Sequence, residues 1–136
     1  MFFFFHPSIG KQNEREWEAA TAVLDFVRTA MPSVNLAELR VFLEIIREDG
    51  SDQERLPTLK DFSERLSIPY PTLARHTDNL GSGVSRKGGL GLIDKIPTPT
   101  SLKEKNVILT PRGTFIATKI DAILGEVSEK YTNPRK

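Results

Sequence analysis

The sequence contains no cysteine and only two histidines, which limits the chemistry open to the chain. Without cysteine it can form no disulfide, no thiol nucleophile and no cysteine-based zinc site. His6 and His76 have no paired carboxylates at ligand spacing, and no serine or threonine lies in a nucleophile-elbow pattern. We therefore expect no metal, no cofactor and no enzyme activity, and a cytoplasmic location for this cysteine-free protein.

The chain also lacks an apolar run long enough to cross a membrane. The run at its start, MFFFF, ends at His6 and Pro7, whereas a spanning helix needs ~18 apolar residues. The basic leader and cleavage site of a signal peptide are missing as well. We expect residues 1–12 to form an apolar arm that packs on the protein's own surface or on a partner subunit, without membrane contact. A free, adhesive arm is the alternative.

Composition is otherwise that of a soluble globular protein, with 38% hydrophobic and 27% charged residues. The length of 136 residues predicts one domain, over residues 13–130, and a disordered tail over residues 131–136. The net charge of +1 is unevenly spread: residues 1–55 carry six basic and ten acidic residues, and residues 56–112 carry nine and five. This asymmetry favours a polyanionic partner for the middle of the chain, with ordinary surface solvation as the alternative.

Helix starts are marked by capping patterns. Asn13, Asn35 and Thr58 each precede an acidic residue by three positions, which predicts three helix starts. Two prolines around Tyr70 and the Thr110–Pro111 pair predict two more. The expected helices cover residues 14–31, 36–48, 59–66, about 70–80 and 111–130, with Gly50 and Gly81 ending the second and fourth.

The two short helices joined by a three-residue link fit a helix-turn-helix. The glycine-rich, basic stretch from Gly81 to Gly89 is expected to be too flexible for an element of its own. After it, Leu90, Leu92 and Ile96 alternate as in a strand, TSLKEK reads as a polar tip, and NVILT reads as a second strand. The sequence thus predicts a mainly α chain with a small β-hairpin, an α+β fold.

Four stretches in this order carry a family resemblance: TLARHTDNL, GLGLIDK, TSLKEKNVILT and LTPRG. From about residue 36 to 124 the chain resembles the MarR-like winged helix-turn-helix regulators. It departs from them in the inserted GSGVSRKGG and in Ser101 and Lys103, where the family often has an acid and an arginine. The resemblance implies a winged helix-turn-helix whose hairpin is the wing, and a homodimer built by helices 14–31 and 111–130. The expected dimerisation residues are Trp17, Val23, Leu24, Val27, Ile116, Ile120, Ile123 and Leu124.

The second helix of the helix-turn-helix has one apolar side, centred on Leu73 with Thr77 and Leu80 beside it. Arg75 lies on the opposite side, where it could contact guanine or a phosphate, unless it is only solvated or paired with Asp78 or Asn79. The basic residues of the glycine-rich stretch and of the hairpin tip are expected on DNA phosphates or in the minor groove, with a mobile linker and plain solubility as alternatives. The expected DNA-binding residues are Tyr70, Pro71, Thr72, Arg75, His76, Asn79, Arg86, Lys87, Lys103 and Lys105.

These features together predict a homodimeric, sequence-specific protein that binds double-stranded DNA and regulates transcription as a repressor. A winged helix that binds other proteins is the alternative from a different class. A DNA-binding accessory protein in plasmid or phage replication or partition would share the same binding chemistry. A small-molecule effector is compatible with the resemblance, but no residue singles out a pocket for one.

Overall fold

The computed structural model describes residues 9–49, 56–84 and 87–132 of the chain. They divide into two compact units. One, here called the winged-helix unit, spans Ser33–Ala117, and the other, the helical unit, combines the chain up to Pro32 with the chain from Thr118 onward. The apolar run at residues 2–5 lies outside the described residues. Within the described ranges, no helix is both long and apolar enough to span a membrane.

The helical unit contains α1 (Ile9–Gln12), α2 (Glu14–Ala30) and the larger part of α6 (Pro111–Thr132). Glu18 joins α2 to α6, because Lys130 Nζ lies 3.0 Å from Glu18 Oε2 and the Tyr131 hydroxyl donates to Glu18 Oε1 at 2.8 Å. α6 ends at Thr132, two residues past the predicted end at residue 130. The predicted disordered tail is wrong for its first two residues, and residues 133–136 lie outside the described part.

The predicted cap at Asn13 is also wrong, since its side chain makes no capping hydrogen bond. The one-turn helix α1 leads almost directly into α2, so Asn13 does not have the extended backbone of a typical cap. Only its carbonyl takes part, accepting a hydrogen bond from Trp17 N at 3.0 Å.

The winged-helix unit starts with α3 (Leu36–Asp49), α4 (Leu59–Leu66) and α5 (Tyr70–Leu80). The other two of the three predicted capping patterns are confirmed: Glu38 N donates to Asn35 Oδ1 at 2.8 Å, and Asp61 N donates to Thr58 Oγ1 at 3.1 Å, each with the reciprocal bond. Gly50, the predicted end of α3, lies outside the described residues. The core of this unit contains Leu39, Val41, Phe42, Ile45, Leu59, Phe62, Leu73, Leu80, Leu92, Ile93 and Val107.

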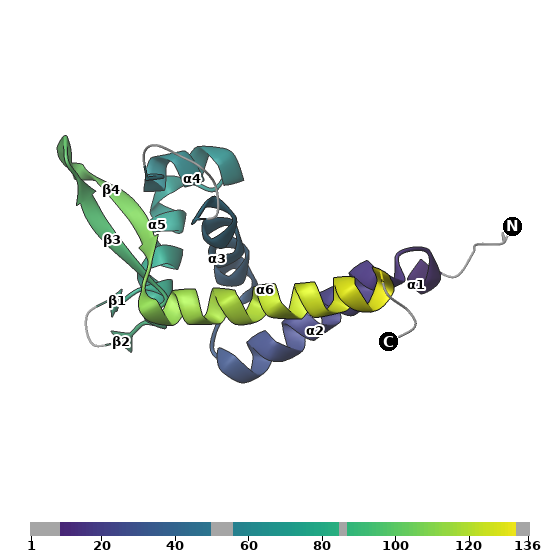
Figure 1. Ribbon diagram of the computed structural model, residues 1–136. Helices are drawn as coiled ribbons and strands as arrows, with labels where there is room; N and C mark the ends of the chain where they lie inside the picture. Colours follow the sequence, from purple (N-terminus) through teal and green to yellow (C-terminus); the bar gives the residue numbers. More distant parts are fainter. Residues whose placement is uncertain (1–8, 50–55, 85–86, 133–136) are drawn as a thin grey trace, which may run out of the picture. The chain divides into compact units, whose positions relative to one another are not determined.

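The hairpin consists of β3 (Ile93–Thr98) and β4 (Ser101–Leu109), which pair antiparallel and project from the helices of the unit (Figure 1). Its turn is Pro99–Thr100, closed by a hydrogen bond from Ser101 N to Thr98 Oγ1 at 3.0 Å. The predicted tip TSLKEK falls mostly within the bounds of β4, but residues 102–104 have no partner in β3, because the pairing jumps from Pro97–Lys105 to Thr98–Ser101 at the end of the hairpin. The predicted alternation fails at Ile96, which is exposed, while Ile93 is buried.

The stretch between α5 and the hairpin contains two short strands in its described residues, contrary to the prediction that it would form no element of its own. β1 (Gly83–Val84) and β2 (Lys87–Gly88) form a two-residue ladder. The chain then returns along the end of α5, where Leu90 N donates to Asn79 O at 2.9 Å and Leu92 N to Leu80 O at 2.8 Å. These bonds satisfy carbonyls that a helix end leaves without partners.

Close approach explains why glycine is needed in this return. A Cβ on Gly89 would lie 2.2 Å from the Gly81 carbonyl oxygen and 2.8 Å from that of Asn79. Glycine at this position therefore allows the backbone to pack against the end of α5. From composition alone, the glycines of this stretch indicated only flexibility.

Candidate nucleic-acid interface

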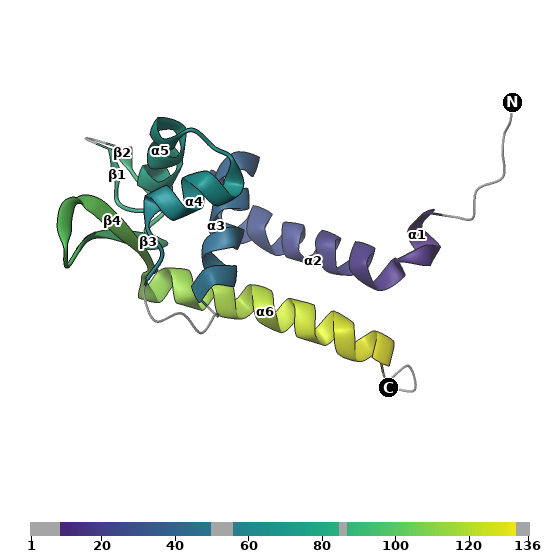
Figure 2. The same cartoon turned by 90° about the horizontal axis from the view of Figure 1, so that it is seen from above.

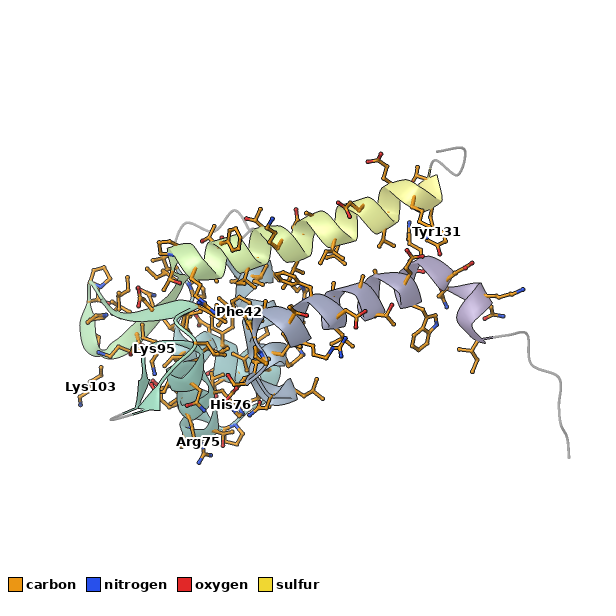
Figure 3. The ribbon with its side chains drawn as sticks, turned by 90° about the horizontal axis from the view of Figure 1, so that it is seen from below. Phe42, Arg75, His76, Lys95, Lys103 and Tyr131 are labelled. Atoms are coloured by element: carbon orange, nitrogen blue, oxygen red, sulfur yellow. The ribbon has the colours of Figure 1, made fainter. Side chains whose placement is uncertain are left out.

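α5 divides into a buried side and a solvent side, as predicted. Leu73, Thr77 and Leu80 are buried, and Thr77 Oγ1 is satisfied by the carbonyl of Leu73 at 3.0 Å. Arg75 on the opposite side is exposed and extends into solvent (Figure 3). Pro71 is exposed and Tyr70 is 42% exposed, while Thr72 and His76 are half-buried at the edges of this surface.

Arg75 is free to bind a ligand. The two neighbours that could have paired with it have other partners: Asp78 forms an ion pair with Lys95, and Asn79 Nδ2 donates to Glu38 Oε2 at 2.9 Å. Within the described ranges, no hydrogen bond or ion pair joins Arg75 to another residue. An exposed guanidinium on a helix offers planar donors that match guanine or a phosphate.

Asn79 is exposed, as the sequence predicted, but unlike Arg75 its side chain already has a partner within the protein. Its amide nitrogen binds the carboxylate of Glu38, which is 5% exposed and whose other oxygen accepts from Asn35 N at 3.2 Å. The side chain of Asn79 thus fixes the end of α5 to α3. Because Glu38 lies 41 residues earlier in the chain, no local pattern could indicate this contact.

β4 is held against the segment that leads into α4. Val107 N donates to Pro57 O at 3.1 Å, and the buried Asn106 donates its amide to Leu56 O at 3.1 Å. An isolated bridge between Thr58 and Asn106 continues this contact. The neighbouring residues of β4 therefore lie beside α4, an arrangement visible from above in Figure 2.

A groove of about 370 Å³ lies between α4, the start of α5 and β4. Its cations are Lys60, Lys103 and Lys105, and its anions are Glu64 and Glu104, so its local net charge is +1. Sequence analysis placed Lys103 and Lys105 at the hairpin tip and missed the third lysine; the structure places all three in one groove. The remaining residues that line the groove are Thr58, Ser63 and Tyr70.

An ion cluster around the buried carboxylate of Glu44 fixes α4 to α3. The Glu44 carboxylate lies 3.1 Å from Arg40 and from Arg47, and 3.5 Å from Arg65 of α4. Burial raises the pKa of Glu44, but the hydrogen bond from Arg40 and the charges of Arg47 and Arg40 outweigh it, so the net pKa lies below the usual range. Arg65 also pairs with Glu48 and stacks over the Phe62 ring at 5.6 Å.

Two predicted basic residues lie on the stretch after α5. Lys87 belongs to β2, and Arg86 lies outside the described residues. A second residue that sequence analysis missed is Lys95, which belongs to β3 and joins the hairpin to α5 through Asp78.

The predicted dimerisation residues separate into two groups. Trp17 and Leu24 on α2 and Leu124 on α6 are exposed in the single chain, and Val23 and Ile123 are half-buried. By contrast, three residues are already buried in the single chain. These three are Val27, Ile116 and Ile120.

The helix-turn-helix of α4 and α5, followed by the β3–β4 hairpin, defines a winged helix-turn-helix fold. Solved structures share it: MepR, a transcription regulator of the Staphylococcus aureus multidrug efflux pump MepA, is 15% identical, with a TM-score of 0.63 over 96% of this chain and 84% of its own. Wild-type MarR from E. coli is 16% identical, with a TM-score of 0.56 over 96% of this chain and 87% of its own. A MepR–DNA complex from S. aureus is 16% identical, with a TM-score of 0.60 over 90% and 85%. No family model and no curated protein matches the sequence. The predicted fold is thereby confirmed.

Proposed function

We propose that this protein is a cytoplasmic homodimer that binds double-stranded DNA sequence-specifically and regulates transcription as a repressor. The observation that carries the proposal is the unpaired, exposed Arg75 on the solvent side of α5, next to a wing whose lysines share a groove with α4. The similar fold of MepR in a complex with DNA, and of MarR, a multiple antibiotic resistance repressor, supports it.

The recognition surface fits the dimensions of duplex DNA. α5 has 11 residues, and because an α-helix with its side chains is about 10–12 Å across, its exposed side can enter a major groove about 12 Å wide. Arg75 then reads a guanine or grips a phosphate, and Thr72 lies one turn earlier on the same side. Tyr70 and Pro71 at the start of the helix supply apolar contact.

The wing contributes affinity through phosphates. Lys60, Lys103 and Lys105 converge on one groove from α4 and β4, and each lysine that neutralises a phosphate releases a counterion. Such contacts fix the register of the protein on the duplex, while the base contacts of α5 carry the sequence information.

A second copy completes the proposed assembly. Trp17 and Leu24 lie seven positions apart on α2, which places both on one side of the helix, and each is 52% exposed. Exposed large apolar side chains on a helix indicate an association surface. A symmetric dimer would carry two recognition helices and bind two half-sites about one helical turn apart.

The test is a selection of duplexes from a random pool, followed by fluorescence anisotropy on the selected sequence. Arg75→Ala is expected to reduce affinity at least tenfold, roughly the value of a good bidentate base contact. Arg15→Ala serves as the control, since it removes the same charge from an exposed position of α2 on the side away from Trp17 and Leu24, and should leave affinity within about twofold. Binding that is the same for wild type and Arg75→Ala would refute the proposed recognition surface.

The dimer is tested separately by light scattering after size-exclusion chromatography. The double change Trp17→Glu and Leu24→Glu should convert a dimer into a monomer, while Thr29→Glu, also exposed but on another side of α2, should not. A monomeric wild-type protein would contradict the proposed assembly.

A protein-binding module is the second candidate, and one observation favours it. Glu64 and Glu104 reduce the net charge of the groove to +1, which is modest for a surface that meets phosphates. Salt titration separates the two, because phosphate-driven binding weakens steeply with salt and a protein interface lacks that slope. A role in replication or partition would share the DNA-binding chemistry with transcription regulation.

A further inference from the structure

We infer that Lys95 controls DNA affinity indirectly, by neutralising a carboxylate that the recognition helix would otherwise present to the duplex. This inference rests on the proposed DNA-binding function. The carboxylate is that of Asp78, which follows Arg75 by three positions and therefore lies on a neighbouring part of the same helix surface.

The ion pair links two separate elements of the interface. Lys95 comes from β3 and Asp78 from α5, 17 residues apart in sequence, and Lys95 lies where the wing meets the recognition helix (Figure 3). The two side chains are 23% and 35% exposed, so the pair is accessible to solvent but partly shielded from it. It lines a shallow hollow of about 160 Å³ at the surface of the unit.

Charge explains why this pairing matters for a polyanionic ligand. An unpaired carboxylate on the surface that enters the groove would repel nearby phosphates, and the partial burial makes salt screening less effective there. A second carboxylate, Asp94, is exposed at the same hollow, and among the described residues that line the hollow Lys95 is the only cation. Because the ammonium of Lys95 is already bound to Asp78, it acts through that residue and is not counted among the phosphate ligands.

The structure therefore predicts an unusual pattern of mutant effects. Lys95→Met keeps the apolar stem of the lysine and removes its charge; it should weaken binding about five- to tenfold, since Asp78 is left unpaired. Asp78→Asn should bind as well as wild type or slightly better. The double variant Lys95→Met with Asp78→Asn should recover to within about twofold of wild type, because the repelling charge is gone.

The experiment measures anisotropy for these three variants, wild type and Arg75→Ala on one selected duplex, with thermal unfolding of each protein in parallel. Recovery in the double variant supports the inference. A loss in Lys95→Met that Asp78→Asn does not rescue means that Lys95 contacts DNA itself, and overturns it. If Lys95→Met and Asp78→Asn lose affinity to the same extent, and both also lower the melting temperature, the pair only holds the wing to the helix. That result also overturns the inference.

Arg75→Ala keeps this test distinct from that of the proposed function. If Arg75→Ala weakens binding while Lys95→Met has no effect, the inference about Lys95 fails alone. If wild type binds no duplex, the proposed function fails with it.

Discussion

Salt dependence of DNA binding gives the sharpest test of the groove between α4 and the wing. The change is the triple variant Lys60→Gln, Lys103→Gln and Lys105→Gln, which removes all three cations of that groove. Each neutralised phosphate contributes about −0.9 to the slope of log K against log salt concentration. The slope of the triple variant should therefore be less steep than that of wild type by about 2.7. Between ~50 mM and ~200 mM salt, wild-type affinity should then fall about 40-fold more than that of the variant.

The assay is fluorescence anisotropy with one selected duplex at five or more salt concentrations. A matched control removes three lysines from the helical unit, Lys11→Gln, Lys119→Gln and Lys130→Gln, and should leave the slope within about one phosphate equivalent of wild type. An unchanged slope in the groove variant would refute the assignment of phosphates to this groove. Equal loss in both variants would show that only net charge matters.

Three further predictions concern stability and titration. Gly89→Ala should lower the free energy of unfolding by about 3 kcal/mol in urea denaturation, because its Cβ would collide with the Gly81 carbonyl oxygen; a loss below about 1 kcal/mol would contradict this contact. Glu44→Gln should cost about 1–2 kcal/mol near neutral pH, discounted for the exposure of its arginines. Since the pKa of Glu44 is lowered on folding, its contribution is present above the ordinary carboxyl pKa and is lost as pH falls through the folded value; unfolding curves of wild type and variant should therefore converge in acid. The hydrogen bond to Glu18, followed by desolvation, raises the pKa of Tyr131 to about 12, so ultraviolet titration should show a late tyrosinate component that Tyr131→Phe removes.

Local signals predicted the helical framework well. The capping boxes at Asn35 and Thr58 each join a side chain to the backbone three residues away, so the sequence contains the whole interaction. The same pattern failed at Asn13, because whether an asparagine caps a helix depends on the backbone before it, and here α1 leads into α2.

The parts of the site that depend on distant residues were not predictable in this way. Asn79 is an exposed residue, as the helix pattern indicates, but only the fold brings the carboxylate of Glu38 to its amide. Lys60 joins the wing lysines because β4 pairs with the segment before α4, a contact between residues about 50 apart. The apolar stripe of α2 also depends on distant residues for its burial. The sequence alone therefore could not show that Val27 packs inside its own chain while Trp17 stays exposed.

Glu38 has a consequence for genetics. One oxygen of this carboxylate starts α3 and the other anchors the end of α5, so a single side chain sets both where a supporting helix begins and how the reading helix is seated. A screen for chains that still accumulate in cells but no longer control their target should therefore recover substitutions at Glu38, a position with no access to the ligand.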